Sequence, residues 1–325
     1  TGQGGVEPHR AVGRVPDARL DHLASLYRPK RVVPAQISWV DVPGFAPGLT
    51  ADGAREATRF LEHGRRVDAL AQVARCFDGG YGDPDPAGEL ATLALELTVA
   101  DLQIVENRLE RLARERKLKG KVASPLEPPL LERFRTHLEA ERPLRELTLN
   151  ADEAKVVAGY AFLTLKPLIV VLNHDEAAGP PADLAAAARA AGAQVVPLCA
   201  RVEEELAALA PEEAREFLAE MGETEPAAHR MIHAAYAALD VHSFFTVGPD
   251  ECRAWTVRRG AHAPAAAGVI HSDLERGFIR AEVCAYADLA AAGSHAAAKA
   301  AGKVRLEGKS YVVQDGDILE IRFSV

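Results

Sequence analysis

An amide and two carboxylates follow directly after an apolar run in the middle of the chain. Leu168–Leu172 is predicted to be a buried strand, and Asn173-His174-Asp175-Glu176 comes next. A polar loop at the end of such a strand can hydrogen-bond a nucleotide base. An Asp there accepts two hydrogen bonds from guanine, whereas a Glu at this position, as in Glu176, relaxes or reverses guanine selectivity. The same residues could equally form an exposed polar loop that binds nothing.

A second group with possible chemistry is Asp41-Val42-Pro43-Gly44. A carboxylate at a strand end can hold Mg²⁺ through water, and a glycine amide can contact a γ-phosphate. An Asp that ends a strand before a turn glycine is also common in proteins without a nucleotide. The motif alone therefore leaves both interpretations open.

A phosphate-binding loop of the form GxxxxGK[ST] is approached at only one place. Gly308-Lys309-Ser310 has the required tail, but Lys303 occupies the position of the opening glycine. A helix should follow such a loop, whereas Tyr311–Val313 is predicted to be a strand. We interpret this segment as a hairpin turn.

Composition limits the class of protein. The chain has 325 residues, is 48% hydrophobic and 26% charged, and carries a formal charge of −9. These values indicate a globular protein of two or three domains, and they argue against a protein that coats nucleic acid. No apolar run approaches the roughly 20 residues of a membrane span, and no signal peptide opens the chain. Because the chain begins with Thr1, we expect either an interior fragment or a chain whose first residues are missing.

The cysteines are widely separated and form no CxxC pair, so we expect four buried thiols in a reducing cytoplasm. They are Cys76, Cys199, Cys252 and Cys284. A zinc site that would combine two of them with His262 and His271 lacks ligand spacing.

Strands alternate with helices in the first half, which predicts a parallel α/β sheet. The elements expected for it are a strand in 31–44, a helix at 54–66, a strand at 68–77, a strand ending at 176, and helix, strand and helix start in 181–206. Helical signal continues to about Leu239. The tail predicts a small α+β domain with short strands in 243–257, 277–286, 309–314 and 317–325 and an Ala-rich helix near 287–301.

Between these parts lies a charged segment with a helical apolar stripe. Spacing of three and four residues places its apolar side chains on one face of each of two helices, joined by a Pro-rich turn. The stripe residues are Leu102, Val105, Leu109 and Leu112, then Leu131, Phe134 and Leu138. We predict an antiparallel helical hairpin whose stripes pack on each other.

Four long segments carry a resemblance to one known family. They are VPDARLDHLASLYRPKRVVPAQISWVDVPG, FLTLKPLIVVLNHDE, ECRAWTVRRGAHAPAAAGVIHSDLERGFIRAEV and AGKVRLEGKSYVVQDGDILEIRFSV. Over essentially its full length the sequence resembles the YchF/Obg-like ATPase family of TRAFAC P-loop NTPases. The last two segments resemble the family's C-terminal TGS domain, a ubiquitin-like β-grasp module.

The resemblance implies an α/β fold: a P-loop NTPase-type parallel sheet, an inserted helical coiled-coil hairpin and a C-terminal β-grasp domain. The implied domains are 1–84 with 160–240, then 85–159, then 241–325. In the family the P-loop lies in the first strand and helix, so we expect it to precede Thr1. The intact protein would then be a Mg²⁺-dependent ATPase/GTPase, and the chain without that loop would be inactive.

The site residues implied by the resemblance fall into two groups. Asp41 would hold Mg²⁺ through water, Gly44 would meet the γ-phosphate, and Phe45 matches the hydrophobic residue that replaces a water-orienting Gln. In the second group, Asn173 and Glu176 match the NxxE loop that accompanies ATP preference over GTP. Cys199-Ala200 stands where a Ser-Ala pair flanks the base.

Two residues depart from the family. Gly5 stands where a Thr helps to coordinate Mg²⁺, unless the shortened segment shifts the alignment, and Gln72 stands where several members have His. Both departures favour an alternative function: a non-catalytic ribosome- or RNA-binding adaptor with a degenerate NTPase core.

The family's association with ribosomes implies a cytoplasmic protein that contacts the ribosome or ribosomal RNA through its hairpin and TGS domain, with no membrane or DNA partner. The basic run at 107–121 could contact RNA phosphates or simply form a solvated helical face. For His271 and Arg276, packing or hydrogen bonding is the expected role.

Overall fold

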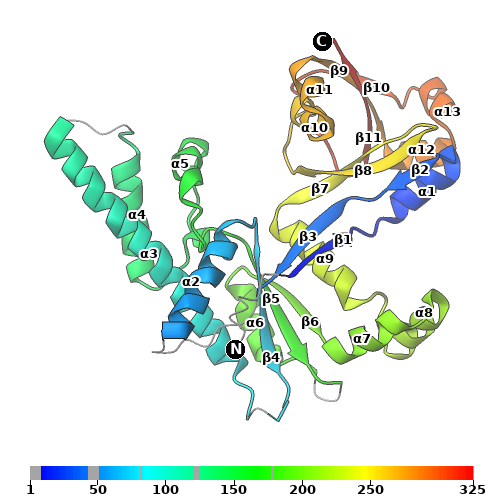
Figure 1. The fold of residues 1–325 in the computed structure, drawn as a ribbon. Helices are drawn as coiled ribbons and strands as arrows, with labels where there is room; N and C mark the ends of the chain where they lie inside the picture. Colours follow the sequence, from blue (N-terminus) through cyan, green and yellow to red (C-terminus); the bar gives the residue numbers. More distant parts are fainter. Residues whose placement is uncertain (1–8, 43–50, 81, 120–123, 177–178, 325) are drawn as a thin grey trace, which may run out of the picture. The chain divides into compact units, whose positions relative to one another are not determined.

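The computed structural model describes residues 9–42, 51–80, 82–119, 124–176 and 179–324. Contacts divide the chain into two compact units. Among the described residues, the first unit holds Val42–Ala238, and the second combines His9–Asp41 with the C-terminal part from Leu239. The predicted boundaries placed residues 9–41 with the NTPase domain and stay a prediction. Both units mix helices with strands (Figure 1), which confirms the α/β class.

The first unit is built on a parallel sheet of strand order β4-β5-β6. Its elements in chain order are α2 (Ala51–Arg65), β4 (Leu70–Cys76), α3 (Pro86–Lys119), α4 (Glu127–Glu139), η1 (Leu144–Glu146), α5 (Ala151–Val157), η2 (Ala158–Tyr160), β5 (Leu168–His174), α6 (Ala182–Ala190), β6 (Gln194–Leu198), α7 (Ala200–Ala208), α8 (Pro211–Glu220) and α9 (Ala227–Ala238). The register places Asn173 between Arg75 and Leu198, so the carboxyl ends of the strands are level.

The central strand and one edge strand of this sheet differ in burial. In the central strand β5, Ile169–Leu172 are all buried, as expected for a parallel strand covered on both faces. In β4, by contrast, Val73 is 62% exposed. Among the described residues β4 pairs only with β5, so β4 is an edge strand there.

The helices α3 and α4 lie side by side (Figure 1) and share one apolar core. Val105 and Leu112 of α3 pack in the same cluster as Leu131, Phe134 and Leu138 of α4, which confirms the predicted stripe packing. Phe134 also meets Phe162 edge-to-face, with ring centroids 5.6 Å apart. The hairpin is therefore tied to the segment that leads into β5.

A polar cluster fastens the same hairpin. The Arg108 guanidinium donates to both carboxylate oxygens of Glu127, at 2.8 and 3.0 Å, and to the Tyr160 hydroxyl at 3.0 Å. The hydrogen bond from Arg108 lowers the pKa of Glu127. Burial, with the hydrogen bond to Glu127 next, raises the pKa of Tyr160 to about 12. Arg108 is thus a structural residue of the hairpin.

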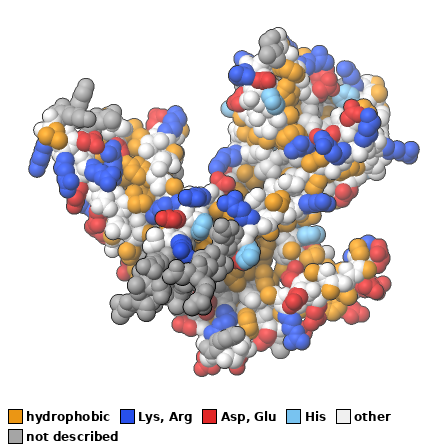
Figure 2. Space-filling model, in the orientation of Figure 1, with side chains coloured by type: hydrophobic (Ala, Val, Ile, Leu, Met, Phe, Trp, Pro, Cys, Tyr) orange, Lys and Arg blue, Asp and Glu red, His pale blue; other side chains and the backbone are white. Residues whose placement is uncertain are grey.

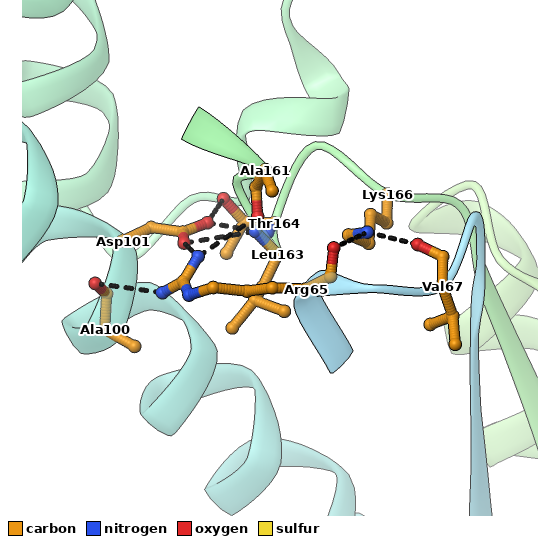
Figure 3. A network of polar contacts seen from close by, with 8 residues as sticks. All are labelled: Arg65, Val67, Ala100, Asp101, Ala161, Leu163, Thr164 and Lys166. Carbon is orange, nitrogen blue, oxygen red and sulfur yellow. Dashed lines mark hydrogen bonds and ion pairs between the residues drawn. The ribbon is translucent and has the colours of Figure 1, made fainter. Parts of the chain in front are cut away.

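The carboxylate of Asp101, in the middle of α3, is fully buried. Figure 3 shows the groups that contact it. The carboxylate pairs with Arg65 at 3.1 Å and accepts hydrogen bonds from the backbone N–H groups of Leu163 and Thr164, at 3.1 and 2.7 Å. The Thr164 hydroxyl donates a further bond at 2.8 Å. Arg65 also donates to the Ala161 carbonyl at 3.1 Å. One buried charge thereby joins α2, α3 and the chain entering β5.

The second unit contains a six-stranded sheet of order β10-β9-β11-β7-β8-β2. The elements of this unit are β1 (His9–Arg14), α1 (Ala18–Tyr27), β2 (Arg31–Val33), β3 (Gln36–Asp41), β7 (Val241–Thr246), β8 (Glu251–Arg258), α10 (Ala263–Ile270), α11 (Ser272–Arg276), β9 (Phe278–Ala285), α12 (Tyr286–Ala292), α13 (His295–Ala300), β10 (Arg305–Glu307) and β11 (Asp317–Phe323). β11 is parallel to β7 and antiparallel to β9, and α10 packs in the main core with Phe244 and Leu319.

Three predicted elements of this unit differ in the structure. The strand predicted in 31–44 breaks at Pro34, which has no N–H to donate, so β2 pairs with β8 and β3 pairs with β1. The predicted Ala-rich helix is two helices, because Gly293 adopts φ 73° and Ser294 caps α13. Residues 309–314 form no strand; Val312 makes only an isolated bridge with His262.

Among the helices that the described ranges contain, none combines the length and the apolar character that crossing a membrane requires.

We expect Asp101→Ala to lower the free energy of unfolding of the first unit by about 3–5 kcal/mol, because it leaves the Arg65 charge and two backbone N–H groups without their acceptor. Urea unfolding followed by far-UV circular dichroism measures this change. Both tryptophans, Trp39 and Trp255, lie in the second unit, so their fluorescence should report an unshifted transition. Glu132→Ala, which removes an exposed ion pair with Arg135, should change little. A small effect of Asp101→Ala would contradict the stabilising role of this carboxylate in the first unit.

His242 of β7 is 4% exposed, and neither ring nitrogen has a hydrogen-bond partner among the described residues. Burial lowers its pKa; the charged groups that act on it are Asp315, Arg259, Asp317 and Arg19. Since the folded pKa lies below the unfolded value of about 6.5, the stabilising effect of neutral His242 is present above that pH and is lost as the pH falls.

We therefore predict that the melting temperature of the second unit, read from tryptophan fluorescence, falls between pH 7 and pH 5.5. In His242→Phe this fall should be smaller than in the unchanged protein. His233→Gln serves as the control, because His233 is exposed and lies in the first unit. Equal pH profiles for the His242 variant and the unchanged protein would refute the role of this histidine.

Candidate functional site

The candidate site in the first unit lies where β5 and β6 end. Asn173 is the last residue but one of β5, and its side-chain oxygen accepts a hydrogen bond from the Ala200 N–H at 3.1 Å. Ala200 begins α7, and Cys199 is its N-cap residue without a side-chain cap bond. The Asn173 side chain thus supplies the acceptor that the start of α7 lacks. The structure brings Asn173 together with Cys199-Ala200, as the resemblance implies.

The start of α7 is held from its other side by α9. The Glu203 carboxylate accepts from the backbone N–H groups of Ala227 and Ala228, at 2.8 and 3.1 Å, which caps α9. Arg230 of α9 donates to the Pro197 carbonyl in β6 at 3.2 Å. These bonds connect residues far apart in the sequence, so no sequence motif predicts them. They join α7 and β6, both next to Asn173 or its partner Ala200, to α9.

Glu176 follows β5 on the same edge, and its side chain is 54% exposed. Its described ionic partner is Arg201, with the guanidinium nitrogen 3.9 Å from the carboxylate, and Arg201 also lies 3.6 Å from Glu205. Exposed pairs at such distances contribute little to stability. The Glu176 carboxylate is therefore accessible to a ligand. Arg201 was not identified from the sequence.

Of the other predicted residues, the structure describes Asp41, which lies in the second unit. Asp41 is exposed and ends β3, where it pairs with His9 across the antiparallel ladder. Among the residues described, it makes no ion pair, and its carboxylate oxygens suit Mg²⁺. Gly44 and Phe45 lie outside the described residues, as does Gly5. The roles of all four stay predictions.

Gln72, the departure in β4, has a structural partner. Its side-chain amide donates to the Glu89 carbonyl at 2.8 Å, and the Glu89 carboxylate accepts from the Arg75 N–H at 2.9 Å. These two bonds join β4 to the first turn of α3. Packing of the sheet therefore accounts for Gln72.

The remaining sequence candidates have no ligand-binding geometry among the described residues. Gly308-Lys309-Ser310 is followed by no helix. His271 caps α11 by accepting the Asp273 N–H at 3.1 Å, as expected of a hydrogen-bonding residue, and Arg276 pairs with Asp273.

A different group of possible metal ligands, Glu282, His295 and Glu320, has its donor atoms within 4.8 Å of one another. Glu282 already pairs with Lys299, at 3.7 Å, and with Arg322. Glu282, one of the three possible ligands, is thus already paired with two cations.

Comparison with known proteins places this geometry in context. A family profile named YchF-GTPase_C, described as a protein of unknown function (DUF933), matches residues 241–324. The ribosome-binding ATPase YchF of Bacillus subtilis (strain 168) is 41% identical, over 98% of this chain and 90% of that protein. Obg-like ATPase 1 of Oryza sativa subsp. japonica is 36% identical, over 98% of this chain and 84% of that protein.

A solved structure, that of the Schizosaccharomyces pombe YchF GTPase, matches with a TM-score of 0.81. It is 32% identical in sequence and covers 98% of this chain and 88% of its own. Near-complete coverage at these identities leaves one conclusion: the chain belongs to the YchF family of Obg-like ATPases.

Proposed function

We propose that this protein is a ribosome-associated P-loop nucleoside triphosphatase that prefers ATP to GTP. The observation that carries the proposal is the loop at the ends of β5 and β6, where Asn173 is fixed to Ala200 and the Glu176 carboxylate is accessible. Ligands of parallel α/β sheets bind outside the carboxyl ends of the strands. The names of the relatives, ribosome-binding ATPase and Obg-like ATPase, support the same activity.

The base would be read by two side chains. Because the Asn173 oxygen is used by Ala200, its amide N–H₂ remains to donate to a ring nitrogen of the base. The Glu176 carboxylate accepts hydrogen bonds only, so it suits the amino group of adenine. Its longer side chain is displaced from the position from which an Asp would accept both guanine donors. Cys199 and Ala200 would flank the base.

The phosphates and the metal would be met by other residues. The carboxylate of Asp41 fits Mg²⁺ bound through water, because it is exposed and ends a strand. Bound Mg²⁺ supplies positive charge that offsets the charge on the phosphates. Gly44 would donate its N–H to the γ-phosphate. Phe45, which is hydrophobic, would not orient the attacking water as a Gln at this position does.

We predict that Glu176→Asp moves the preference toward GTP by about tenfold, which corresponds to about 1.4 kcal/mol. The shorter side chain places a carboxylate where guanine N1–H and the 2-amino group can both reach it. The protein is expressed from its complete reading frame and loaded with a fluorescent ATP analogue. Displacement of the analogue by ATP and by GTP then measures the two dissociation constants. Their ratio is the result.

Glu205→Asp is the matched control, since Glu205 shares the partner Arg201 but lies one turn along α7. It should leave the ratio unchanged. A ratio that stays the same in Glu176→Asp would reject Glu176 as a base-reading residue. If neither nucleotide displaces the probe while ribosome binding persists, the non-catalytic adaptor becomes the better account.

Contact with the ribosome is proposed for the outer part of the hairpin. Arg111, Arg116 and Lys117 of α3 are exposed, whereas Arg108 is engaged by Glu127. Figure 2 shows Lys and Arg side chains along this part of the hairpin, interspersed with acidic ones. Exposed cations on a helix pair suit RNA phosphates. The C-terminal TGS domain would provide a further contact.

We predict that replacing Arg111, Arg116 and Lys117 together by Glu weakens co-sedimentation with ribosomes at least tenfold at low salt. The loss should shrink as salt rises, since the contact depends on phosphate charge.

A variant with the same change of charge elsewhere in the first unit is the control. Arg66, Arg189 and Arg215 are also exposed, and their replacement by Glu should have a smaller effect. Equal losses in the two variants would mean that net charge alone, and not the hairpin, governs binding.

A further inference from the structure

A cavity of about 720 Å³ lies at the amino ends of β5 and β6, whereas the base loop lies at their carboxyl ends. It is bounded by residues 142–149 after α4, the chain entering β5 at 165–168, the turn at 190–194, and the last residues of α9. All of these segments belong to the first unit. The volume falls within the range of about 300–1,000 Å³ that is usual for small-molecule sites.

The cavity is separate from the nucleotide site proposed above. Its wall includes Leu168, the first residue of β5, whereas Asn173 lies five residues further along the same strand. At about 3.3 Å per residue the two are about 16 Å apart. A ligand in the cavity would therefore leave the base loop free.

Two arginines line the cavity, and they differ in their partners. Arg142 is neutralised, because its guanidinium donates to the Glu146 carboxylate at 2.8 and 2.7 Å. Arg145 donates only to the carbonyls of Thr164 and Lys166, at 3.3 and 3.4 Å. Among the described residues Arg145 forms no ion pair with a carboxylate. One guanidinium at this site thus lacks a carboxylate in direct contact among the described residues, although Glu146 and Asp101 act on its charge from a distance.

The surroundings of Arg145 make a charge without a contacting carboxylate unfavourable. Burial lowers the pKa of Arg145, which means that water is partly withdrawn from its charge. The nearest acids are already engaged: Glu146 by Arg142, and Asp101 by Arg65 and the backbone. Both bonds of Arg145 come from a single nitrogen, Nη1, so Nε–H and Nη2–H remain as donors. Those two nitrogens are spaced for an oxyanion that binds two at once.

The rest of the wall combines the polar side chains of Glu146 and Gln194 with an apolar part. Leu147, Leu149, Leu165 and Leu168 contribute to it, together with Ala237 of α9. A ligand that matches both features has a charged head and a flat or aliphatic body. We propose that this cavity binds a small organic anion, with a carboxylate or phosphate group on Arg145 and an apolar body against the leucines.

Binding of two model anions to the full chain tests the proposal: naphthalene-2-carboxylate and phenyl phosphate, measured by isothermal titration calorimetry. We expect at least one to bind with a dissociation constant near the millimolar range. Naphthalene-2-carboxamide, which is uncharged, should bind at least tenfold more weakly than the carboxylate. Which of the two anions binds better distinguishes carboxylates from phosphate monoesters as the ligand class.

Three variants make the test specific. Arg145→Gln should weaken binding at least tenfold, whereas Arg142→Gln, which removes an arginine already paired, should weaken it less than threefold. Ala237→Phe should also abolish binding, because it fills the cavity from an exposed position and leaves Arg145 in place. If Arg145→Gln does not fold, Ala237→Phe decides the question.

The proposal fails if neither anion binds, or if binding survives both Arg145→Gln and Ala237→Phe. It also fails if ATP displaces the bound anion, because the two sites lie at opposite ends of the strands. If Glu176→Asp weakens ATP binding but leaves anion binding unchanged, the two sites are independent and the cavity proposal is supported.

Discussion

The buried carboxylate of Asp101 is the constraint on which the first unit depends. A charge with no exposed surface must be surrounded by donors, and here they come from α2, from the backbone at Leu163 and Thr164, and from the Thr164 hydroxyl. Lys166 adds a second tie, since its ammonium donates to the Arg65 carbonyl at 3.1 Å and to that of Val67 (Figure 3). The long hairpin is thereby anchored where the chain enters β5. The anchor precedes the start of β5, and Asn173 lies near its end, so one strand connects the anchor to the base loop.

Local patterns in the sequence predict what local physics determines. The apolar run of β5, the stripes of α3 and α4, and the polar loop after β5 were all predicted, because periodicity and composition report burial directly. Asp101 could not be predicted, because its donors are 62 and 63 residues away and an Asp within a charged helix resembles any solvated residue. The position of Asn173 followed from the motif, but the Ala200 partner followed from family resemblance alone. Tyr311–Val313 alternates like a strand, yet the segment finds only one bridging partner.

The basic run on α3 illustrates how a fold sorts charges that look alike in sequence. Arg108 is consumed by Glu127, Tyr160 and Glu115, the last at 3.2 Å, while Arg114 pairs with Glu110 at 3.1 Å. Arg111, Arg116 and Lys117 are left in solvent. The same distinction separates Arg142 from Arg145 at the cavity beside the amino ends of β5 and β6. In both places the cations that we propose bind anions are those whose neighbouring acids are already paired with other residues. Composition alone does not show which cations these are.

The exposed strand β4 has a practical consequence for anyone who handles this chain. Within the part of the chain that the structure describes, no strand pairs with the outer side of β4, although the Glu89 carboxylate accepts from the Arg75 N–H, and Val73 presents an apolar side chain. Such an edge is a template for strand addition by another molecule. Self-association through β4 would grow with concentration and would remove protein from solution without any loss of the fold. A lysine in place of Val73 would interrupt that pairing while leaving the contact between β4 and β5 in place.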